Sequence, residues 1–150
     1  MGMTRRQIRE NVFRLVFEYG FCREAEREEQ ARMYFDKYGE EELPNPPELA
    51  GEEEAAYITE KAQKVAALIP QLDERLNKVA KGWRTGRMAK ADLAILRLAV
   101  YEMFYDSQIP TGVAINEAVE LAKRYGTDES PAFINGLLAR LAKDEAGEET

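Results

Sequence analysis

Residues 91–105, ADLAILRLAVYEMFY, form the most hydrophobic stretch of the chain and leave almost no polar face at helical spacing. A helix that is apolar on nearly all sides has to be surrounded by other elements of the fold. The rest of the chain also follows the helical period almost everywhere, and the sustained alternation typical of strands is absent. Its 150 residues suit one domain with a single sizeable core. We therefore predict an all-α protein in which this segment is the central buried helix of a bundle.

Start and stop signals divide the chain into about six to seven helices. Thr4, with Gln7 three residues later, fits a capping box at the start of the first helix. Ser130 as N-cap and Pro131 at the first helical position mark the start of the last helix. Gly126 is expected to end the preceding helix in a left-handed conformation. The expected helices cover approximately residues 4–19, 24–38, 53–69, 71–80, 91–105, 111–125 and 130–143.

Two stretches do not fit a helix. Residues 40–53, EEELPNPPELAGEE, contain three prolines, which cannot lie in a helix interior, so we expect a loop with some mobility. Residues 144–150, DEAGEET, are expected to form a disordered acidic tail. Pro70 is expected either to kink the third helix or to begin a new one.

The composition argues against several classes of chemistry. The chain has one cysteine, Cys22, and no histidine, so it lacks an internal disulfide and the residues of a conventional zinc site. Without histidine the commonest general base and all Ser-His or Cys-His nucleophile pairs are missing. We expect neither an enzyme, a metal nor a cofactor. No apolar run approaches the ~20 residues of a membrane span, and no signal peptide is visible, so we expect a cytoplasmic protein without membrane contact.

The net charge of −7 is distributed unevenly along the sequence. Residues 1–14 carry four arginines and one glutamate, residues 24–60 carry thirteen acidic against three basic side chains, and residues 77–91 carry five basic side chains and no acid. Two basic islands on an acidic chain are compatible with RNA bound on one side and a basic protein on another. The alternative is that these charge runs are merely solvated helix faces.

The first basic island has an aromatic component. On a helical wheel, Arg6, Arg9, Phe13 and Phe17 form a second strip beside the apolar stripe. Arginines neutralise phosphates, while rings and guanidinium planes stack on unpaired bases, so this mixture suits single-stranded RNA. The alternative is that the two phenyl rings pack under the proline-containing loop.

The second basic island, residues 78–90, contains Trp83 in its middle. This ring is able to stack on a base, although a tryptophan at a helix end more often closes a core. The basic residues also fit a simpler role, since positive charge is favourable near the C-terminus of a helix.

The C-terminal part contains two asparagines among small and apolar neighbours, Asn116 and Asn135, and a glycine inside a helix, Gly136. We expect these three residues to be structural, with both amides bonding across a helix joint and Gly136 allowing another backbone to pass close by. The polar loop between the two helices is expected to be exposed at the start of a helix, where free N–H groups are able to hold phosphate. It comprises Lys123, Arg124, Thr127, Asp128 and Glu129.

Three motifs resemble the bacterial NusB family of transcription antitermination factors. They are TRRQIRENVFRLVFEY at residues 4–19, DLAILRLAVYEM at 92–103 and VAINEAVELAKRYGTDESPAFINGLL at 113–138. The resemblance runs in order over nearly the whole chain, and the last motif is long and specific. The acidic middle is its least diagnostic part.

The resemblance implies a helical bundle of two small subdomains within one domain, residues 1–143, with halves at about 4–80 and 88–143. It implies binding of the boxA element of nascent ribosomal RNA transcripts together with NusE, a ribosomal protein, within the RNA polymerase antitermination complex. Arg5, Arg6 and Arg9 match the family's arginine-rich motif, and Phe17 stands where relatives can carry a tyrosine. The RNA-binding candidates are Thr4, Arg5, Arg6, Arg9, Phe13, Phe17, Lys123, Arg124, Asp128 and Glu129; those for the protein partner are Glu102 and Tyr105.

The chain also departs from what the resemblance implies. The basic arm before the first helix is short, and the protein is more acidic than an RNA binder that acts alone would prefer. Because of both features, we expect RNA binding to depend more strongly on a basic protein partner. Some relatives self-associate and hide the RNA surface, so a homodimer is possible. The alternative function is therefore a homo-oligomeric protein–protein adaptor whose RNA contact is incidental.

Overall fold

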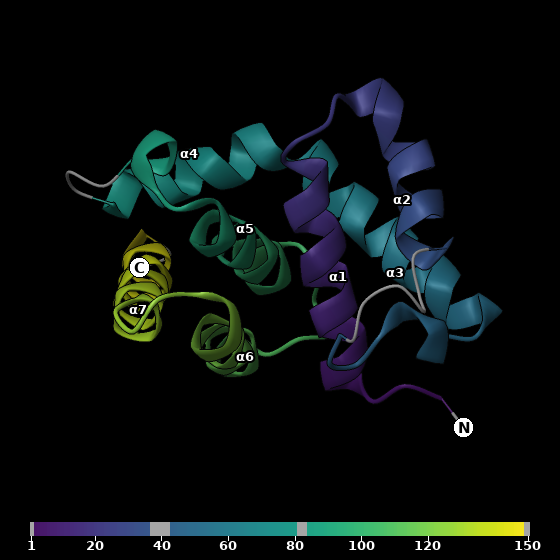
Figure 1. Ribbon diagram of the computed structural model, residues 1–150. Coiled ribbons are helices and arrows are strands. Elements are labelled where there is room, and N and C mark those ends of the chain that lie inside the picture. Colours follow the sequence, from purple (N-terminus) through teal and green to yellow (C-terminus); the bar gives the residue numbers. More distant parts are fainter. Residues whose placement is uncertain (1, 37–42, 81–83, 149–150) are drawn as a thin grey trace. The chain divides into compact units, whose positions relative to one another are not determined.

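The computed structural model describes residues 2–36, 43–80 and 84–148, and this part of the chain is helical with no strand (Figure 1). The all-α prediction is confirmed. Three short 3-10 helices, η1 (Glu24–Glu26), η2 (Pro47–Leu49) and η3 (Thr85–Arg87), accompany seven α-helices in the described ranges. These are α1 (Arg5–Tyr19), α2 (Arg27–Asp36), α3 (Glu52–Ala67), α4 (Ile69–Val79), α5 (Lys90–Phe104), α6 (Thr111–Tyr125) and α7 (Ser130–Glu148).

The chain divides into two compact units, Met1–Ala67 and Leu68–Thr150. The sequence placed the division near the second basic island, residues 78–90. The structure instead groups α4 with the second unit, because α4 packs on α5 and α7. The break falls at Leu68, whose backbone leaves the helical region, and Pro70 lies in the first turn of α4. Of the two expected outcomes at Pro70, the structure shows a new helix.

In the first unit, α1 packs mainly against α3 and also contacts α2. Four apolar side chains of α1 line this contact and are at most 2% exposed: Val12, Leu15, Val16 and Tyr19. Helix α3 contributes Ile58, Ala62 and Val65 to the same core. The predicted capping box at Thr4 is also confirmed.

In the second unit, α5 is buried along most of its length, as its sequence predicts, with nine buried residues between Leu93 and Glu102. It packs against α6, which in turn packs against α7. The side chain of Arg97 on α5 forms a two-point ion pair with Asp73 on α4, with N–O distances of 2.9 and 2.8 Å. Such a paired fork fixes the orientation of the two helices as well as their spacing.

The last helix extends beyond its predicted end. We expected it to stop at about Lys143 and the remaining acidic residues to be disordered, but α7 continues to Glu148. A tertiary contact explains the difference, because Glu145 accepts a hydrogen bond of 2.7 Å from Arg75 on α4. An acidic segment without an apolar stripe gives no sequence signal for such a contact.

The turn between α6 and α7 also differs from the prediction. Gly126 has an extended backbone, with φ −98° and ψ −170°, rather than a left-handed one. Glycine is required at this position for a steric reason instead, because a Cβ atom would lie 2.5 Å from the Cβ and Oγ of Ser130. Ser130 is the first residue of α7, and its hydroxyl accepts a bond of 2.9 Å from the N–H of Thr127 in the turn.

Candidate nucleic-acid interface

The N-terminal arginines extend from the first turn of α1. This turn is held by a capping box and by a hydrogen bond from the preceding residue to α3. Thr4 Oγ1 accepts a bond from the Gln7 N–H at 3.1 Å, and the Thr4 N–H donates to Gln7 Oε1 at 2.8 Å. The preceding Met3 N–H donates to Glu54 Oε2 on α3 at 2.7 Å. Arg5 and Arg6 are exposed and Arg9 is half-buried. The short basic arm is therefore anchored to the first unit rather than trailing from it.

The aromatic strip is only partly where the wheel predicted it. Phe13 is 3% exposed, so its ring is buried and is not available for the base-stacking role. Phe17 is half-buried, and its ring centroid lies 6.3 Å from that of Phe13 and 5.1 Å from that of Phe21. Phe21, which the sequence analysis did not single out, is 64% exposed. The accessible aromatic surface therefore lies at the C-terminal end of α1.

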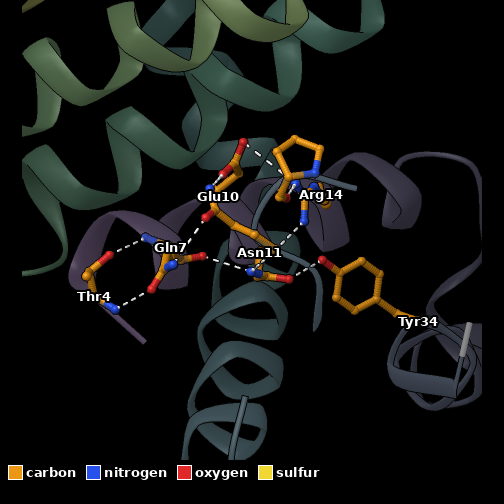
Figure 2. A network of polar contacts seen from close by, with 8 residues as sticks. Thr4, Gln7, Glu10, Asn11, Arg14 and Tyr34 are labelled. Carbon is orange, nitrogen blue, oxygen red and sulfur yellow. Dashed lines mark hydrogen bonds and ion pairs between the residues drawn. The ribbon is translucent and has the colours of Figure 1, made fainter. Parts of the chain in front are cut away.

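Arg14 does not contribute to the basic surface, although it belongs to the basic island of the sequence. It is 8% exposed, and its guanidinium donates to the backbone carbonyls of Asn45, at 2.9 Å, and Pro44 (Figure 2). Its Nη2 also lies 3.7 Å from a carboxylate oxygen of Glu10. A wheel could not reveal this use, because the partners lie about thirty residues away in the sequence.

The second candidate surface is the α6–α7 loop in the second unit. Lys123 and Arg124 are exposed in the last turn of α6, where Lys123 Nζ lies 3.3 Å from Glu120 Oε1. Asp128 and Glu129 are exposed, as is Thr127. The tight packing of Gly126 on Ser130 fixes the shape of this loop. The prediction of an exposed polar loop at the start of a helix is therefore confirmed.

The structural role predicted for the two asparagines and Gly136 is wrong. Asn116 and Asn135 are exposed, and neither amide has a hydrogen-bond partner within the described part of the chain. A Cβ atom added to Gly136 would meet nothing within 4 Å, so no neighbouring backbone occupies the space of a side chain there. The joint is instead filled by small and apolar residues such as Ala118, Ala122 and Ile134. The asparagines are therefore surface groups, with free amides that flank the loop residues along the chain.

The basic side chains of the second island, residues 78–90, are also exposed where the structure describes them, while Trp83 lies outside the described residues. Arg84, Arg87 and Lys90 are exposed, as is Lys78 at the end of α4. The segment is held by Thr85, whose N–H donates to Asn77 Oδ1 at 2.9 Å. Arg140 of α7 donates to the carbonyl of Val79 at 2.9 Å, so a cation does neutralise the C-terminus of α4. It comes from another helix rather than from the link.

The two residues expected to contact a protein partner have different surroundings. Glu102 is 1% exposed, whereas Tyr105, at the end of α5, is 40% exposed. The Tyr105 ring stacks on that of Tyr101, with centroids 6.0 Å apart and an interplanar angle of 16°. The guanidinium of Arg75 lies 4.3 Å from the Phe104 ring centroid and 5.6 Å from that of Tyr105. Of these two residues, only Tyr105 is thus open to a partner.

Burial changes the acidity of one pair of groups near the end of α1. Desolvation raises the pKa of Tyr19 to about 12, and it also raises the pKa of the Cys22 thiol. The Tyr19 hydroxyl is buried without a hydrogen-bond partner among the described residues. Neither group lies in a cluster of potential metal ligands, since the described residues contain no group of three or more such side chains.

No helix in the described part of the chain is long and apolar enough to cross a membrane. An all-α protein with exposed arginines and lysines at the start of one helix, at a helix–helix loop and at a second link is typical of helical nucleic-acid-binding proteins. The chain belongs to the NusB family, whose family model matches residues 6–143. The predicted resemblance is therefore confirmed.

Individual relatives agree with this assignment. The chain is 49% identical over 140 residues to the transcription antitermination protein NusB of Agathobacter rectalis, covering 93% of this chain and 100% of the relative. It is 41% identical to the protein of the same name from Lachnoclostridium phytofermentans, covering 93% and 98% of the two chains. Among solved structures it is similar to T. maritima NusB, with a TM-score of 0.79 and 29% identity over 95% of this chain and 93% of that one. The relatives' names describe a role in transcription and not a catalysed reaction.

Proposed function

We propose that this protein is a cytoplasmic transcription antitermination factor that binds the boxA element of nascent ribosomal RNA together with NusE, and so supports processive transcription within the antitermination complex. The family of the chain and the names of its relatives support the role in antitermination. The observation that carries the RNA-binding part is the anchored first turn of α1, which presents Arg5 and Arg6 to solvent on an otherwise acidic chain.

The candidate RNA-binding residues of each unit have their own chemical roles. Arg5, Arg6 and Arg9 neutralise phosphates of single-stranded RNA, and release of the bound counterions makes binding depend on salt. Lys123 and Arg124 act in the same way at the α6–α7 loop. Asp128 and Glu129 are acceptors, so they are suited to the exocyclic amino groups of unpaired bases. Thr4 shapes the first turn through the capping box, while Phe17 and Phe21 offer ring surface for stacking.

The partner in this proposal is a basic protein. Residues 24–60 carry thirteen acidic against three basic side chains, a net charge of −10, which attracts a basic ribosomal protein at long range. Tyr105 offers an exposed ring of the kind enriched at protein interfaces. Because Glu102 is buried, we expect it to support the end of α5 rather than to touch the partner.

The central test is a titration of boxA RNA with and without purified NusE. We expect binding that strengthens with NusE and weakens with salt. Changing Arg5, Arg6 and Arg9 to alanine should reduce the slope of log affinity against log salt by about 0.7 for each lost phosphate contact. The matched control changes Arg23, Arg32 and Lys64 to alanine, since these exposed residues of the same unit remove the same total charge.

Equal salt slopes for the two triple variants would contradict the assignment of the arginines. The alternative adaptor function predicts a different pattern, in which the protein self-associates in light scattering and RNA binds no better with NusE than without it. A wild-type protein that binds a scrambled RNA as well as boxA would also contradict the proposal.

A further inference from the structure

Residues 43–50, which contain three prolines, are fixed on α1 by hydrogen bonds that converge on one residue, Asn45. Its carbonyl accepts from Asn11 Nδ2 at 3.1 Å and from Arg14 Nη1 at 2.9 Å. Its side-chain Oδ1 accepts from Gln7 Nε2 at 3.1 Å, and its Nδ2 donates to Glu10 Oε2. One loop residue thus bonds to four side chains along one face of α1. We call this set of contacts the Asn45 latch; its four partners on α1 are labelled in Figure 2.

The backbone of Asn45 explains why a single residue reaches so many partners. It has a φ of 51°, the one positive φ of a non-glycine residue in the described chain, and asparagine tolerates this left-handed conformation better than most residues. Pro44 and Pro46 on either side have restricted backbones. The carbonyl and the side chain of Asn45 are thereby presented to α1 together.

Three of the four helix residues in the latch are buried, and Gln7 is half-buried. Glu10 and Asn11 are at most 1% exposed and Arg14 is 8% exposed. Asn11 also accepts a bond of 2.5 Å from the Tyr34 hydroxyl on α2, so the network joins two helices and the loop (Figure 2). Buried charged groups tolerate few alternative arrangements, because any lost partner leaves an unsatisfied group in a medium of low polarity. The network therefore specifies one position for the loop.

Gln7 connects the latch to the start of α1. Its Oε1 accepts from the Thr4 N–H to complete the capping box, while its Nε2 donates to Asn45 Oδ1. Both ends of one amide are used, so the rotamer that caps the helix is the rotamer that binds the loop. Arg5 and Arg6 lie directly between Thr4 and Gln7 in the sequence. The order of the first turn is thus coupled to the loop.

We infer that Asn45 is a positioning residue for RNA binding, which holds the first turn of α1 in the conformation that presents Arg5, Arg6 and Arg9. This inference rests on the proposed function. An arginine on an ordered turn loses less conformational freedom when it meets a phosphate than one on a frayed turn. Loss of the latch therefore weakens binding without removing any phosphate contact from the final complex.

The test compares Asn45→Gly with Glu48→Gly. Glycine keeps the left-handed backbone and the carbonyl that Asn11 and Arg14 use, and it removes only the links to Gln7 and Glu10. Glu48 is an exposed residue of the same loop, so its change to glycine controls for added flexibility. We expect Asn45→Gly to bind boxA RNA about tenfold more weakly, with an unchanged salt slope. Hydrogen exchange at the Gln7 amide should become faster in the Asn45 variant alone.

A second variant covers the case in which Asn45→Gly does not fold. Gln7→Glu keeps the acceptor for the Thr4 N–H and loses only the donor toward Asn45, and titration at rising salt screens its added charge. Once salt has screened the added charge, we expect Gln7→Glu to lose as much affinity for RNA as Asn45→Gly does. If wild type binds RNA and both latch variants bind equally well, the inference is overturned. A reduced salt slope in Asn45→Gly would also overturn it, whereas a wild type that does not bind RNA overturns the proposed function itself.

Discussion

Gly126 and Gly136 differ in whether the surrounding structure requires a glycine. Gly126 is required by contact, since the side chain of Ser130 occupies the space that a Cβ atom would need. Gly136 lies inside α7 with open space around its Cα, so nothing in the structure requires a glycine there. The sequence predicted a left-handed conformation for Gly126 and a close backbone contact for Gly136, because capping and propensity rules describe the local chain and not the side chains packed against it.

The two glycines form a matched pair for mutation. We expect Gly126→Ala to lower the free energy of unfolding by ~1–3 kcal/mol, because the new methyl group would collide with Ser130 and with the carbonyl of Ala122. Gly136→Ala should leave it unchanged or raise it by up to ~1 kcal/mol, through better helix propensity. Urea denaturation of both variants measures the difference. A destabilising Gly136→Ala would show that another element does approach α7 at this point.

Exposure of single side chains is what the sequence predicted least well. Periodicity places a residue on a helix face, but whether that face is covered depends on elements elsewhere in the chain. Phe13 is covered, which its place on the helical wheel left open, and Asn116 is exposed, although its small and apolar neighbours predicted a buried amide. The exposure of Lys123, Asp128 and Glu129 was predicted correctly, since a polar turn between two helices has few ways to be buried.

Helix ends were predicted well where their cause is local. The capping box at Thr4 and the new start at Pro70 depend on neighbours a few residues away, and both are found. The extension of α7 to Glu148 is accompanied by a bond to Arg75 in α4, and the buried Glu10 and Arg14 are bonded to Asn45. Such contacts between distant segments leave no periodic pattern in the sequence.

The C-terminal end of α7 provides a prediction at the scale of one helix. Glu145→Ala removes the ion pair with Arg75, so we expect faster hydrogen exchange in the last turns of α7 and a loss of ~1 kcal/mol or less in stability. Arg75→Ala should cost more, because it also removes the guanidinium from the Phe104 ring. The exposed pair partner Glu120 serves as the control, and its change to alanine should leave exchange in α7 as in wild type.

The end of α1 should make stability depend on alkaline pH. Burial raises the pKa of Tyr19 to about 12, against about 10 in the unfolded chain. Below pH ~10 the hydroxyl is neutral in both states, and between pH ~10 and ~12 only the unfolded state ionises, so stability falls as pH rises. We expect the wild type to lose stability relative to Tyr19→Phe across this range in urea melts.

At neutral pH, Tyr19→Phe can be compared with Tyr34→Phe, which removes a hydroxyl that does form a hydrogen bond. Because the Tyr19 hydroxyl has no partner in the described chain, Tyr19→Phe should be neutral or slightly stabilising. Tyr34→Phe should cost ~1–3 kcal/mol, since it leaves the buried Asn11 amide without its donor. Equal losses in the two variants would indicate that Tyr19 has a hydrogen-bond partner after all.

Charge distribution acts at the scale of the whole molecule. Thirteen acidic against three basic side chains lie between residues 24 and 60, while exposed cations lie at the start of α1 and along the link before α5. The sequence was sufficient for this pattern, because net charge requires no knowledge of packing. It could not tell which charges are exposed, and Arg14 is the clearest example of one that is not.

The acidic segment provides a prediction about association. Salt should slow the association of this protein with NusE more than it speeds dissociation, because long-range attraction acts mainly on the encounter. Changing Glu52 and Glu53, which lie at the exposed start of α3, to glutamine should reduce the salt dependence of the association rate. Stopped-flow mixing at several ionic strengths measures both rates. An association rate that does not respond to salt would contradict long-range attraction.

The Asn45 latch should also protect residues 43–50 from proteolytic cleavage. A segment with exposed Leu43, Glu48 and Leu49 has the composition of an accessible cleavage site. A protease needs several residues in extended form in its active site, and this segment cannot adopt that form while Asn45 is bound to four side chains of α1. Cleavage between residues 43 and 50 has to wait for the latch to open. The rate of proteolytic cleavage at this segment therefore reports how often the latch opens. Gel electrophoresis measures this rate without any RNA present.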